Sequence, residues 1–442
     1  RLLATHSTMA KETERRRGKP GRSCFFRVLF ALPASVAGVA LFLAVLDVLR
    51  HAGRLPQSLS MPGLQQVVNQ STNATRWIEK FEGWPVQSRF FSGVASSRRR
   101  TIGTRYFVPQ ELYPLAKCLD GTPPAFYLRR TSSRKWLVFL EGWGFCGSLK
   151  DCYWRSQTSH GSTEGEPHHA DLREKGPYFS SNKMENPLLH NFNWVFIRYC
   201  DGGYFSGDVQ DPVEVNVSRK TRQIWFRGRY IREAVVDHLR RAHQMDMATD
   251  VLMGGCSSGA ITTLFSINVW RELMDWVPNV MAFADSGFFL DLDGEYSYWK
   301  RFIWEHQNAT ASVVPECARQ HAQQPWVCFI AANALPYAQV PVFAWQSRYD
   351  SNQLLGGDCL LPPCVNKFGE DLETQMQTVM ADQSYFIDGC YRHCSGDEPP
   401  LNAEGITPLL ALKQWYFNLT VQIVQEGTYP CKQCCTVDYT AS

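Results

Sequence analysis

Five short apolar runs constrain the fold of this chain more than any other feature of its sequence. They lie at residues 136–140, 194–198, 250–253, 280–284 and 340–345. Short runs that are almost entirely apolar are typical of strands buried on both faces of a sheet. Between the runs, residues 222–243 and 260–276 have apolar side chains three and four positions apart, as helices do. The alternation predicts an α/β fold with a mostly parallel central sheet and helices on both faces.

A Gly-Cys-Ser-Ser-Gly segment, residues 255–259, follows one predicted strand and precedes a predicted helix. This is the context of a nucleophile elbow, a sharp turn whose nucleophile needs small residues two positions away on either side. Ser257 has glycines at both positions, and Ser258 does not. The sequence therefore predicts an α/β-hydrolase-like fold in which Ser257 is the nucleophile. The backbone N–H of Ser258 is expected to stabilise an oxyanion.

The chain order of such a fold is nucleophile, then acid, then base. Asp350 follows the last predicted strand and is the predicted acid, and His393 is the predicted base because no other histidine follows Asp350. Asp285 also ends a predicted strand and is the alternative acid. With Asp285 as the acid, His306 and His321 would become candidate bases. A metal site built from His393 and its neighbouring cysteines is a further alternative.

A Gly-Trp-Gly segment, Gly142, Trp143 and Gly144, follows the predicted strand 136–140. A glycine-rich turn at this position can aim backbone N–H groups at a developing oxyanion. We predict that this segment and Ser258 form the oxyanion hole. An ordinary turn between a strand and a loop is the alternative.

Eight segments follow one another along the chain: CLDGTPPAFYL (118–128), LEGWGFC (140–146), RYCDGGYFSGDV (198–209), WFRGRYI (225–231), GCSSG (255–259), ADSGFFLD (284–291), YDSNQ (349–353) and CYRHC (390–394). With these segments in this order, the chain resembles the pectin acetylesterase and Notum family of carboxylesterases, nearer the plant pectin acetylesterases. The resemblance runs from about 115 to 435 and implies an α/β-hydrolase fold with Ser257, Asp350 and His393 as the triad. It implies a supporting role for Asp285.

The resemblance also implies a function. It implies a serine carboxylesterase that removes O-acetyl groups from a polysaccharide through an acyl-enzyme, without a metal ion or cofactor. A Notum-like deacylase of longer acyl esters on a secreted protein is the alternative, and a membrane-anchored glycan-binding protein with an idle triad is another. Two residues depart from the family pattern: Trp143 interrupts a loop that is commonly Gly-Gly-Trp, and Ser258 stands where alanine is usual.

The N-terminal part of the chain predicts a membrane anchor. Residues 1–27 carry eight Lys and Arg against two Glu, and residues 28–46 are uncharged and long enough to cross a bilayer. We predict a basic cytosolic tail at 1–27, a transmembrane signal anchor at 28–46, a stem region at 47–108 and the esterase domain at 109–442. The expected localisation is a single-pass type II membrane protein of the secretory pathway with a luminal or extracellular catalytic domain, or a secreted protein after cleavage.

The cysteines and glycosylation sequons agree with export. Of the fifteen cysteines, all but Cys24 follow the apolar segment, which allows up to seven disulfides. Local pairs Cys146–Cys152 and Cys317–Cys328 are predicted, and Cys390 or Cys394 is expected to bond toward the cluster at 431–435. Zinc is the alternative for that cluster. The candidate glycosylation sites are Asn69, Asn73, Asn216, Asn308 and Asn418.

The charge of the chain bears on its partners. The net charge is +3, and Lys and Arg form no stripe, so nucleic-acid binding is not expected. The expected partners are an acylated polysaccharide or an acylated secreted protein as substrate, and the membrane through the N-terminal helix. The protein is expected to be a monomer.

Overall fold

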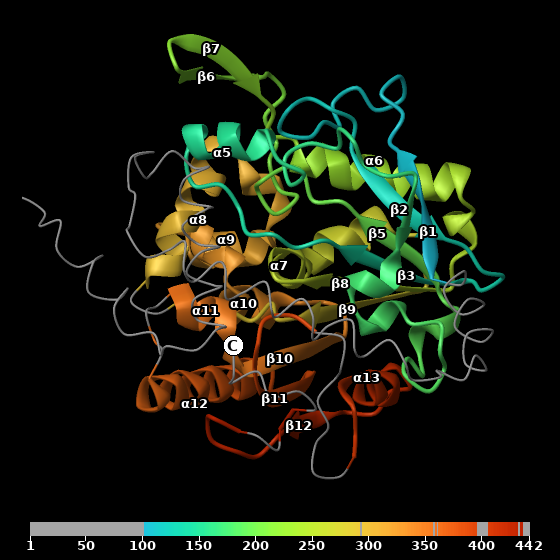
Figure 1. Ribbon diagram of the computed structural model, residues 1–442, viewed down its shortest axis with the longest axis vertical. Coiled ribbons are helices and arrows are strands. Elements are labelled where there is room, and N and C mark those ends of the chain that lie inside the picture. The colour runs from blue at the N-terminus through green and yellow to red at the C-terminus, as the bar shows by residue number, and fades with distance from the viewer. Residues whose placement is uncertain are drawn as a thin grey trace, which may run out of the picture. The chain divides into compact units, whose positions relative to one another are not determined.

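A computed structural model describes residues 101–291, 294–356, 359, 361–395, 405–431 and 434–435. Within these residues, ten strands form one sheet in the order β12-β11-β10-β9-β8-β3-β5-β2-β1-β4 (Figure 1). The strands are β1 (Ile102–Phe107), β2 (Ala125–Arg129), β3 (Lys135–Leu140), β4 (His169–Asp171), β5 (Asn193–Ile197), β8 (Asp250–Cys256), β9 (Asn279–Asp285), β10 (Val342–Asp350), β11 (Ser384–Arg392) and β12 (Gln422–Val424).

The seven strands from β12 to β5 in this order are parallel to one another, whereas β2, β1 and β4 add antiparallel pairs at one edge. The α-helices are α5 (Leu149–Ser156), α6 (Gly228–Ala242), α7 (Ser258–Leu273), α8 (Glu295–His306), α9 (Pro315–Gln320), α10 (Ala331–Ala334), α11 (Ser351–Gly356), α12 (Pro362–Val379) and α13 (Pro408–Tyr416). The predicted class, an α/β-hydrolase-like fold with a mostly parallel sheet, is confirmed.

Alternation along each central strand sends side chains to two apolar layers. In β3, Val138 and Leu140 belong to the layer that also contains residues of α6, α7 and α12. Leu137 and Phe139 belong to the opposite layer, which contains residues of α13 and of the segment 172–192. Because both faces are covered, these strands contain runs of consecutive apolar residues, and the sequence reveals them for this reason.

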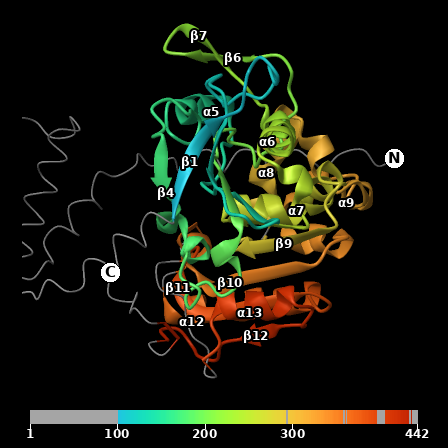
Figure 2. The ribbon, with the colours of Figure 1, turned by 90° about the vertical axis from the view of Figure 1, so that its right-hand side faces the viewer.

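Two elements differ from the prediction. The helix expected at 222–243 begins only at Gly228, because residues 220–224 form β7 (Lys220–Ile224), which pairs with β6 (Val213–Val217) as an antiparallel hairpin. The hairpin lies beside α5 in both views (Figure 1 and Figure 2). The sheet also starts earlier than residue 109, because β1 lies in the range expected for the stem, 47–108. The rest of that range up to residue 100, and the ranges 1–27 and 28–46, lie outside the described residues.

The prediction of a single-pass membrane protein needs correction. No helix in the described part of the chain is both long enough and apolar enough to cross a membrane. The longest of them, α12, has 18 residues and carries Lys367, Glu370, Asp371 and Glu373, and four charges within so short a helix oppose insertion. The segment predicted as the anchor, 28–46, is not among the described residues.

Seven disulfides pair all fourteen cysteines of the described residues. The two predicted local pairs, Cys146–Cys152 and Cys317–Cys328, are both present. The cluster at 431–435 forms disulfides, Cys431–Cys434 and Cys390–Cys435, where zinc was the alternative. The remaining bonds are Cys118–Cys200, Cys256–Cys394 and Cys359–Cys364.

Three of the glycosylation candidates, Asn216, Asn308 and Asn418, are exposed in the structure. Asn69 and Asn73 lie outside the described residues. All five stay predictions.

Candidate active site

The turn between β8 and α7 carries the predicted nucleophile. Ser257 has φ 54° and ψ −125°, a backbone conformation that residues other than glycine rarely adopt. Its N–H donates to the carbonyl oxygen of Asp285 at 3.1 Å, and its own carbonyl oxygen accepts the N–H of Ile261 at 2.8 Å. A Cβ at Gly259 would overlap the carbonyl oxygen of Leu140 at the end of β3. The second glycine of the motif is therefore required by the close approach of this turn to the neighbouring strand.

The predicted acid and base lie in contact. Nδ1 of His393 is 3.0 and 2.9 Å from the two carboxylate oxygens of Asp350. Asp350 is fully buried, and its carboxylate also accepts the N–H groups of Asn352 and Gln353, each at 3.1 Å. Nε2 of His393 is buried and has no hydrogen-bond partner in the described part of the chain. When Nδ1–H donates to the carboxylate, Nε2 is left with a free lone pair and can accept a proton.

A disulfide joins the turn of Ser257 to the loop of His393. It links Cys256, which immediately precedes Ser257, to Cys394, which immediately follows His393, with the two Cα atoms 5.8 Å apart. Their sequence separation is 138 residues. The bond therefore links directly two loops that are far apart in the sequence and meet only in the folded protein.

The Gly142–Gly144 segment lies against the nucleophile turn. A Cβ at Gly142 would overlap the carbonyl oxygen of Cys256 and would lie 3.0 Å from Cβ of Ser257. Gly144 has a positive φ of 59°, and its carbonyl oxygen accepts the hydroxyl of Tyr199 at 2.8 Å. Only a residue without a side chain fits at the first of these positions, so the backbone of the segment can approach Ser257 closely.

Trp143 is held by three groups. Its backbone N–H donates to the Ser258 hydroxyl oxygen at 2.6 Å, and its carbonyl oxygen accepts a hydrogen bond from the Arg155 guanidinium. Its ring stacks on the His160 ring at 4.4 Å between centroids and 5° between planes. Burial, helped by the positive charges of Arg155 and Arg198, lowers the pKa of His160 to about 4. The ring that supports Trp143 is therefore uncharged at neutral pH.

The alternative acid has other partners. The Asp285 carboxylate accepts the Ser395 N–H at 2.7 Å and lies 3.7 Å from the Arg392 guanidinium. Burial raises the pKa of Asp285, and the charge of Arg392 opposes this effect. No contact between Asp285 and the histidines His306 and His321 is found within the described residues. Asp285 therefore stabilises the turn that follows His393, through its hydrogen bond with the Ser395 N–H.

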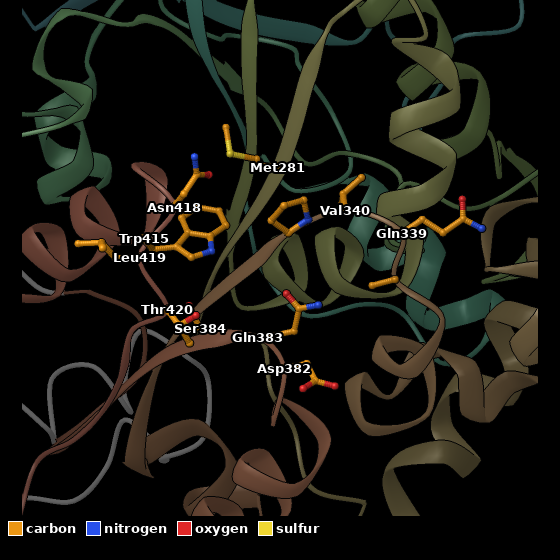
Figure 3. A pocket seen from close by; sticks show the side chains of 12 residues that line it. Met281, Gln339, Val340, Asp382, Gln383, Ser384, Trp415, Asn418, Leu419 and Thr420 are labelled. Atoms are coloured by element: carbon orange, nitrogen blue, oxygen red, sulfur yellow. The ribbon is translucent and has the colours of Figure 1, made fainter.

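One cavity lies away from the triad. It has a volume of about 460 Å³. Residues at the N-terminal ends of β10 and β11, and at the end of α13 and just after it, line this cavity, including Gln383, Ser384, Trp415 and Asn418 (Figure 3). In the parallel part of the sheet, Ser257, Asp350 and His393 lie at the opposite ends of the strands. Figure 3 therefore shows a region remote from the triad residues. No group of three or more metal-ligating side chains occurs among the residues that the structure describes.

The sequence alone does not reveal two of these features. The first is the side chain of Ser258, because only its backbone N–H was assigned a role and its partner lies 115 positions away. The second is the Cys256–Cys394 bond: either Cys390 or Cys394 is expected to bond toward residues 431–435, and it is Cys390 that does so. A signal for this bond exists. If Ser257 and His393 must meet, the cysteines adjacent to them in sequence must also come within bonding distance.

Comparisons with known proteins show which family this chain is similar to. A family model described as pectinacetylesterase matches residues 97–436. Pectin acetylesterase 11 of Arabidopsis thaliana is 28% identical over 370 residues, covering 72% of this chain and 89% of the relative. Palmitoleoyl-protein carboxylesterase notum1' of Xenopus laevis is 30% identical over 258 residues, covering 54% of this chain and 50% of the relative. Identity barely separates these two relatives, but the plant protein is matched over a longer stretch.

Proposed function

The chain belongs to the pectinacetylesterase family and is a carboxylic ester hydrolase, and on this basis we propose that it removes O-acetyl groups from a polysaccharide with Ser257, His393 and Asp350 as its triad. Relatives named pectin acetylesterase match up to 72% of the chain, which favours an acetylated polysaccharide as the substrate. The family resemblance and the site geometry together support this assignment.

One observation carries the proposed mechanism. Asp350 engages one ring nitrogen of His393, and the other, Nε2, is buried without a partner in the described part of the chain. With Nδ1 bound to the carboxylate, the lone pair of Nε2 is free to accept a proton. The disulfide from Cys256 to Cys394 keeps the loop of this histidine beside the turn of Ser257.

In the proposed reaction, His393 Nε2 takes the proton of the Ser257 hydroxyl while the serine oxygen attacks the acetyl carbonyl carbon. Asp350 keeps the imidazole in the tautomer that leaves Nε2 free and stabilises the imidazolium that forms. The imidazolium then gives its proton to the sugar oxygen as its bond to the acetyl carbon breaks, and the sugar leaves with a free hydroxyl. Water, activated by the same histidine, hydrolyses the acetyl-serine and restores the triad.

The oxyanion of each tetrahedral intermediate is proposed to bind backbone N–H groups beside Ser257. The N–H of Ser258 belongs to the first turn of α7, whose N–H groups have no partners within the helix. The N–H groups of Gly142 and Gly144 are proposed to supply the second side of the hole, because the backbone N–H of Trp143 already has the Ser258 hydroxyl as its acceptor. Because Trp143 N–H donates to the Ser258 hydroxyl, that side chain fixes the position of the loop. A donor of this kind contributes about 3–4 kcal/mol to transition-state stabilisation.

A second substrate class has its own support. The Notum relatives are named palmitoleoyl-protein carboxylesterases, and an apolar cluster beside the triad contains Phe289, which lies 6.0 Å from the His393 ring, and Tyr296. Apolar side chains at this position suit an acyl chain longer than acetyl. Comparing 4-nitrophenyl acetate with 4-nitrophenyl octanoate separates the two: acetyl specificity favours the polysaccharide enzyme, and octanoyl specificity favours the protein deacylase.

The mechanism is tested by replacing the two neighbouring serines. We expect Ser257→Ala to lower kcat for 4-nitrophenyl acetate at least 10³-fold while the protein stays folded, because the nucleophile is lost. Ser258→Ala is the matched control. It removes one hydrogen bond of about 1 kcal/mol and keeps the backbone N–H, so its kcat should fall about fivefold.

Two results would overturn the assignment. Full activity of folded Ser257→Ala would reject Ser257 as the nucleophile. A wild-type protein that hydrolyses no ester would instead point to an idle triad on a glycan-binding protein.

A further inference from the structure

A second cavity lies between α5 and the β6–β7 hairpin, outside the candidate active site. Its volume is about 530 Å³, and its lining includes Tyr153, Glu214, Arg222, Gln223, Trp225 and Asp120. The helix and the hairpin pack through a small apolar cluster that contains Cys152, Val215 and Ile224. The walls of the cavity therefore stand on ordered elements, and its surface combines two aromatic rings with carboxylate, amide and guanidinium groups.

This combination matches the surface of a pyranose ring. A pyranose has an apolar face of C–H groups and a rim of hydroxyl groups that both donate and accept hydrogen bonds. Trp and Tyr offer flat apolar faces at a low cost in side-chain entropy. Carboxylates accept from hydroxyls, Arg donates to them, and Gln does both. All four side-chain types line this one cavity.

The position of Trp225 is set by its surroundings. The residues on either side of it, Ile224 and Phe226, are fully buried. Its backbone N–H donates to the carbonyl oxygen of Leu119 at 3.1 Å. The backbone of Gly121 packs on one side of the ring, because a Cβ there would lie 3.0 Å from its Cζ3 atom. The ring is therefore held in place before any ligand arrives, and binding does not have to order it.

Asp120 is also oriented in advance. Its Oδ1 accepts both the N–H and the hydroxyl of Thr122, at 2.9 and 2.6 Å. These two bonds fix the carboxylate and use one oxygen. In the described part of the chain, no hydrogen bond or ion pair to the other oxygen, Oδ2, is found. A sugar hydroxyl can bind there without displacing a protein group.

The cavity is close to the proposed oxyanion loop. Cys146, two residues after Gly144, is bonded to Cys152 on α5 with a Cα–Cα distance of 5.0 Å. Tyr153, which lines the cavity, is the next residue. At about 3.8 Å per residue, the Cα atoms of Gly144 and Tyr153 are at most roughly 16 Å apart. A short run of linked sugars spans such a distance.

We propose that this cavity is a glycan subsite that binds one pyranose unit of the polysaccharide while another, acetylated unit lies at Ser257. The inference rests on the proposed function for the reaction, and it deepens that function by favouring a polysaccharide over an acylated protein. Trp225 stacks on the sugar, and Glu214 and Asp120 accept from its hydroxyls. Arg222 pairs with the carboxylate if the unit is a uronic acid and donates to hydroxyls if it is neutral.

Three substrates test the subsite: 4-nitrophenyl acetate, acetylated pectin with its acidic backbone, and acetylated xylan with its neutral backbone. We expect Trp225→Ala to raise KM at least tenfold for whichever polysaccharide the wild type hydrolyses. Its kcat for that polysaccharide and its turnover of 4-nitrophenyl acetate should stay unchanged. Trp154→Ala is the matched control, because Trp154 is 58% exposed on α5 and does not line the cavity. Arg222→Gln should raise KM for pectin more than for xylan.

The outcomes separate the subsite from the esterase mechanism. An unchanged polysaccharide KM in Trp225→Ala, or an equal rise in Trp154→Ala, overturns the subsite. If Trp225→Ala loses activity on all three substrates through misfolding, the exposed variants Glu214→Gln and Arg222→Gln decide. A raised KM for the polysaccharide in these variants supports the subsite, and an unchanged one overturns it.

A binding measurement keeps the two proposals apart even if no ester is hydrolysed. Ser257→Ala protein is titrated with a xylo-oligosaccharide and with an oligogalacturonide, each followed by isothermal titration calorimetry, whose signal does not depend on Trp225. Binding that disappears in the Ser257→Ala, Trp225→Ala double variant supports the subsite whatever the fate of the proposed reaction. No binding of either probe overturns it.

Discussion

Asp285 and Asp350 end neighbouring parallel strands, but their side chains lie at different heights and have different hydrogen-bond partners. In the register of β9 and β10, Asp285 lies beside Trp345, so Asp350 is five residues farther along its strand. At about 3.3 Å per residue that is roughly 16 Å toward the loops above the sheet. Asp350 therefore reaches His393, whereas Asp285 stays below and accepts the Ser395 N–H.

This difference predicts unequal effects of the same substitution. Asp350→Asn should lower kcat by about 10³- to 10⁴-fold on 4-nitrophenyl acetate, because the amide favours the wrong tautomer of His393. Asp285→Asn should keep kcat within tenfold of the wild type and lower the melting temperature, because it weakens the contact with the buried Arg392. Steady-state kinetics and thermal unfolding of both variants check this. A large kcat loss confined to Asp285→Asn would move the acid to Asp285.

Some residue-level features were readable from the sequence and some were not. Ser257, Asp350 and His393 were predicted from motif and chain order, and the structure brings the last two into hydrogen-bond contact. The Ser258 hydroxyl was not foreseen, because its contact with Trp143 depends on how two distant turns pack. Local sequence patterns predict which turns exist, but they do not encode the distance between them.

At the scale of elements, burial decides which strands the sequence predicts and which it does not. The strands β3, β5, β8, β9 and β10 were predicted because both of their faces are covered. The β6–β7 hairpin was missed because most residues of β7 are exposed and polar, so that the Val-Glu-Val-Asn-Val alternation of β6 has no apolar partner strand in the sequence. It is held by packing on α5, and such a contact cannot be read from the strand itself.

The ends of β8 and β11 are joined by Cys256–Cys394, and this bond should matter for catalysis. We expect the double variant Cys256→Ala, Cys394→Ala to lower kcat for 4-nitrophenyl acetate at least 100-fold at a temperature where it is fully folded, because the loop of His393 is no longer tied to the turn of Ser257. The matched control is Cys317→Ala, Cys328→Ala, which removes a bond that ties neither the turn of Ser257 nor the loop of His393. Its kcat should stay within threefold of the wild type.

Equal kcat losses in these two double variants would mean that the Cys256–Cys394 bond acts only on global stability. Far-UV circular dichroism and thermal unfolding establish the folded range for each variant before kinetics are compared. The long loop closed by Cys256–Cys394 also predicts the larger loss of melting temperature.

At the scale of the whole molecule, one buried acid makes stability depend on pH. Asp201 is fully buried, and one of its oxygens accepts the Gly203 N–H at 3.2 Å. Burial raises its pKa from the usual 3.8 to about 6, and backbone N–H groups and Arg155 only partly offset this rise. Between these pH values the folded protein holds a proton that the unfolded chain has released. The contribution of Asp201 to the free energy of unfolding therefore falls as the pH rises from about 4 to about 6.

Asp201→Asn tests this dependence. The amide cannot ionise and keeps an acceptor oxygen for the Gly203 N–H. We expect the variant to match the wild type near pH 4 and to be more stable at pH 7 by up to about 3 kcal/mol. Guanidinium unfolding of both proteins at each pH gives the difference between their free energies of unfolding. A difference that is the same at pH 4 and pH 7 would exclude ionisation of Asp201 as the cause.

The bond between Cys256 and Cys394 also changes what a cut in the chain would do. It closes a covalent ring with a sequence separation of 138 residues, and Ser257 and His393 lie inside the ring next to the crosslink. A protease that cleaves one peptide bond between them leaves the two fragments joined. The nicked protein keeps the mass of one molecule until its disulfides are reduced, and its nucleophile and base remain on one covalent body.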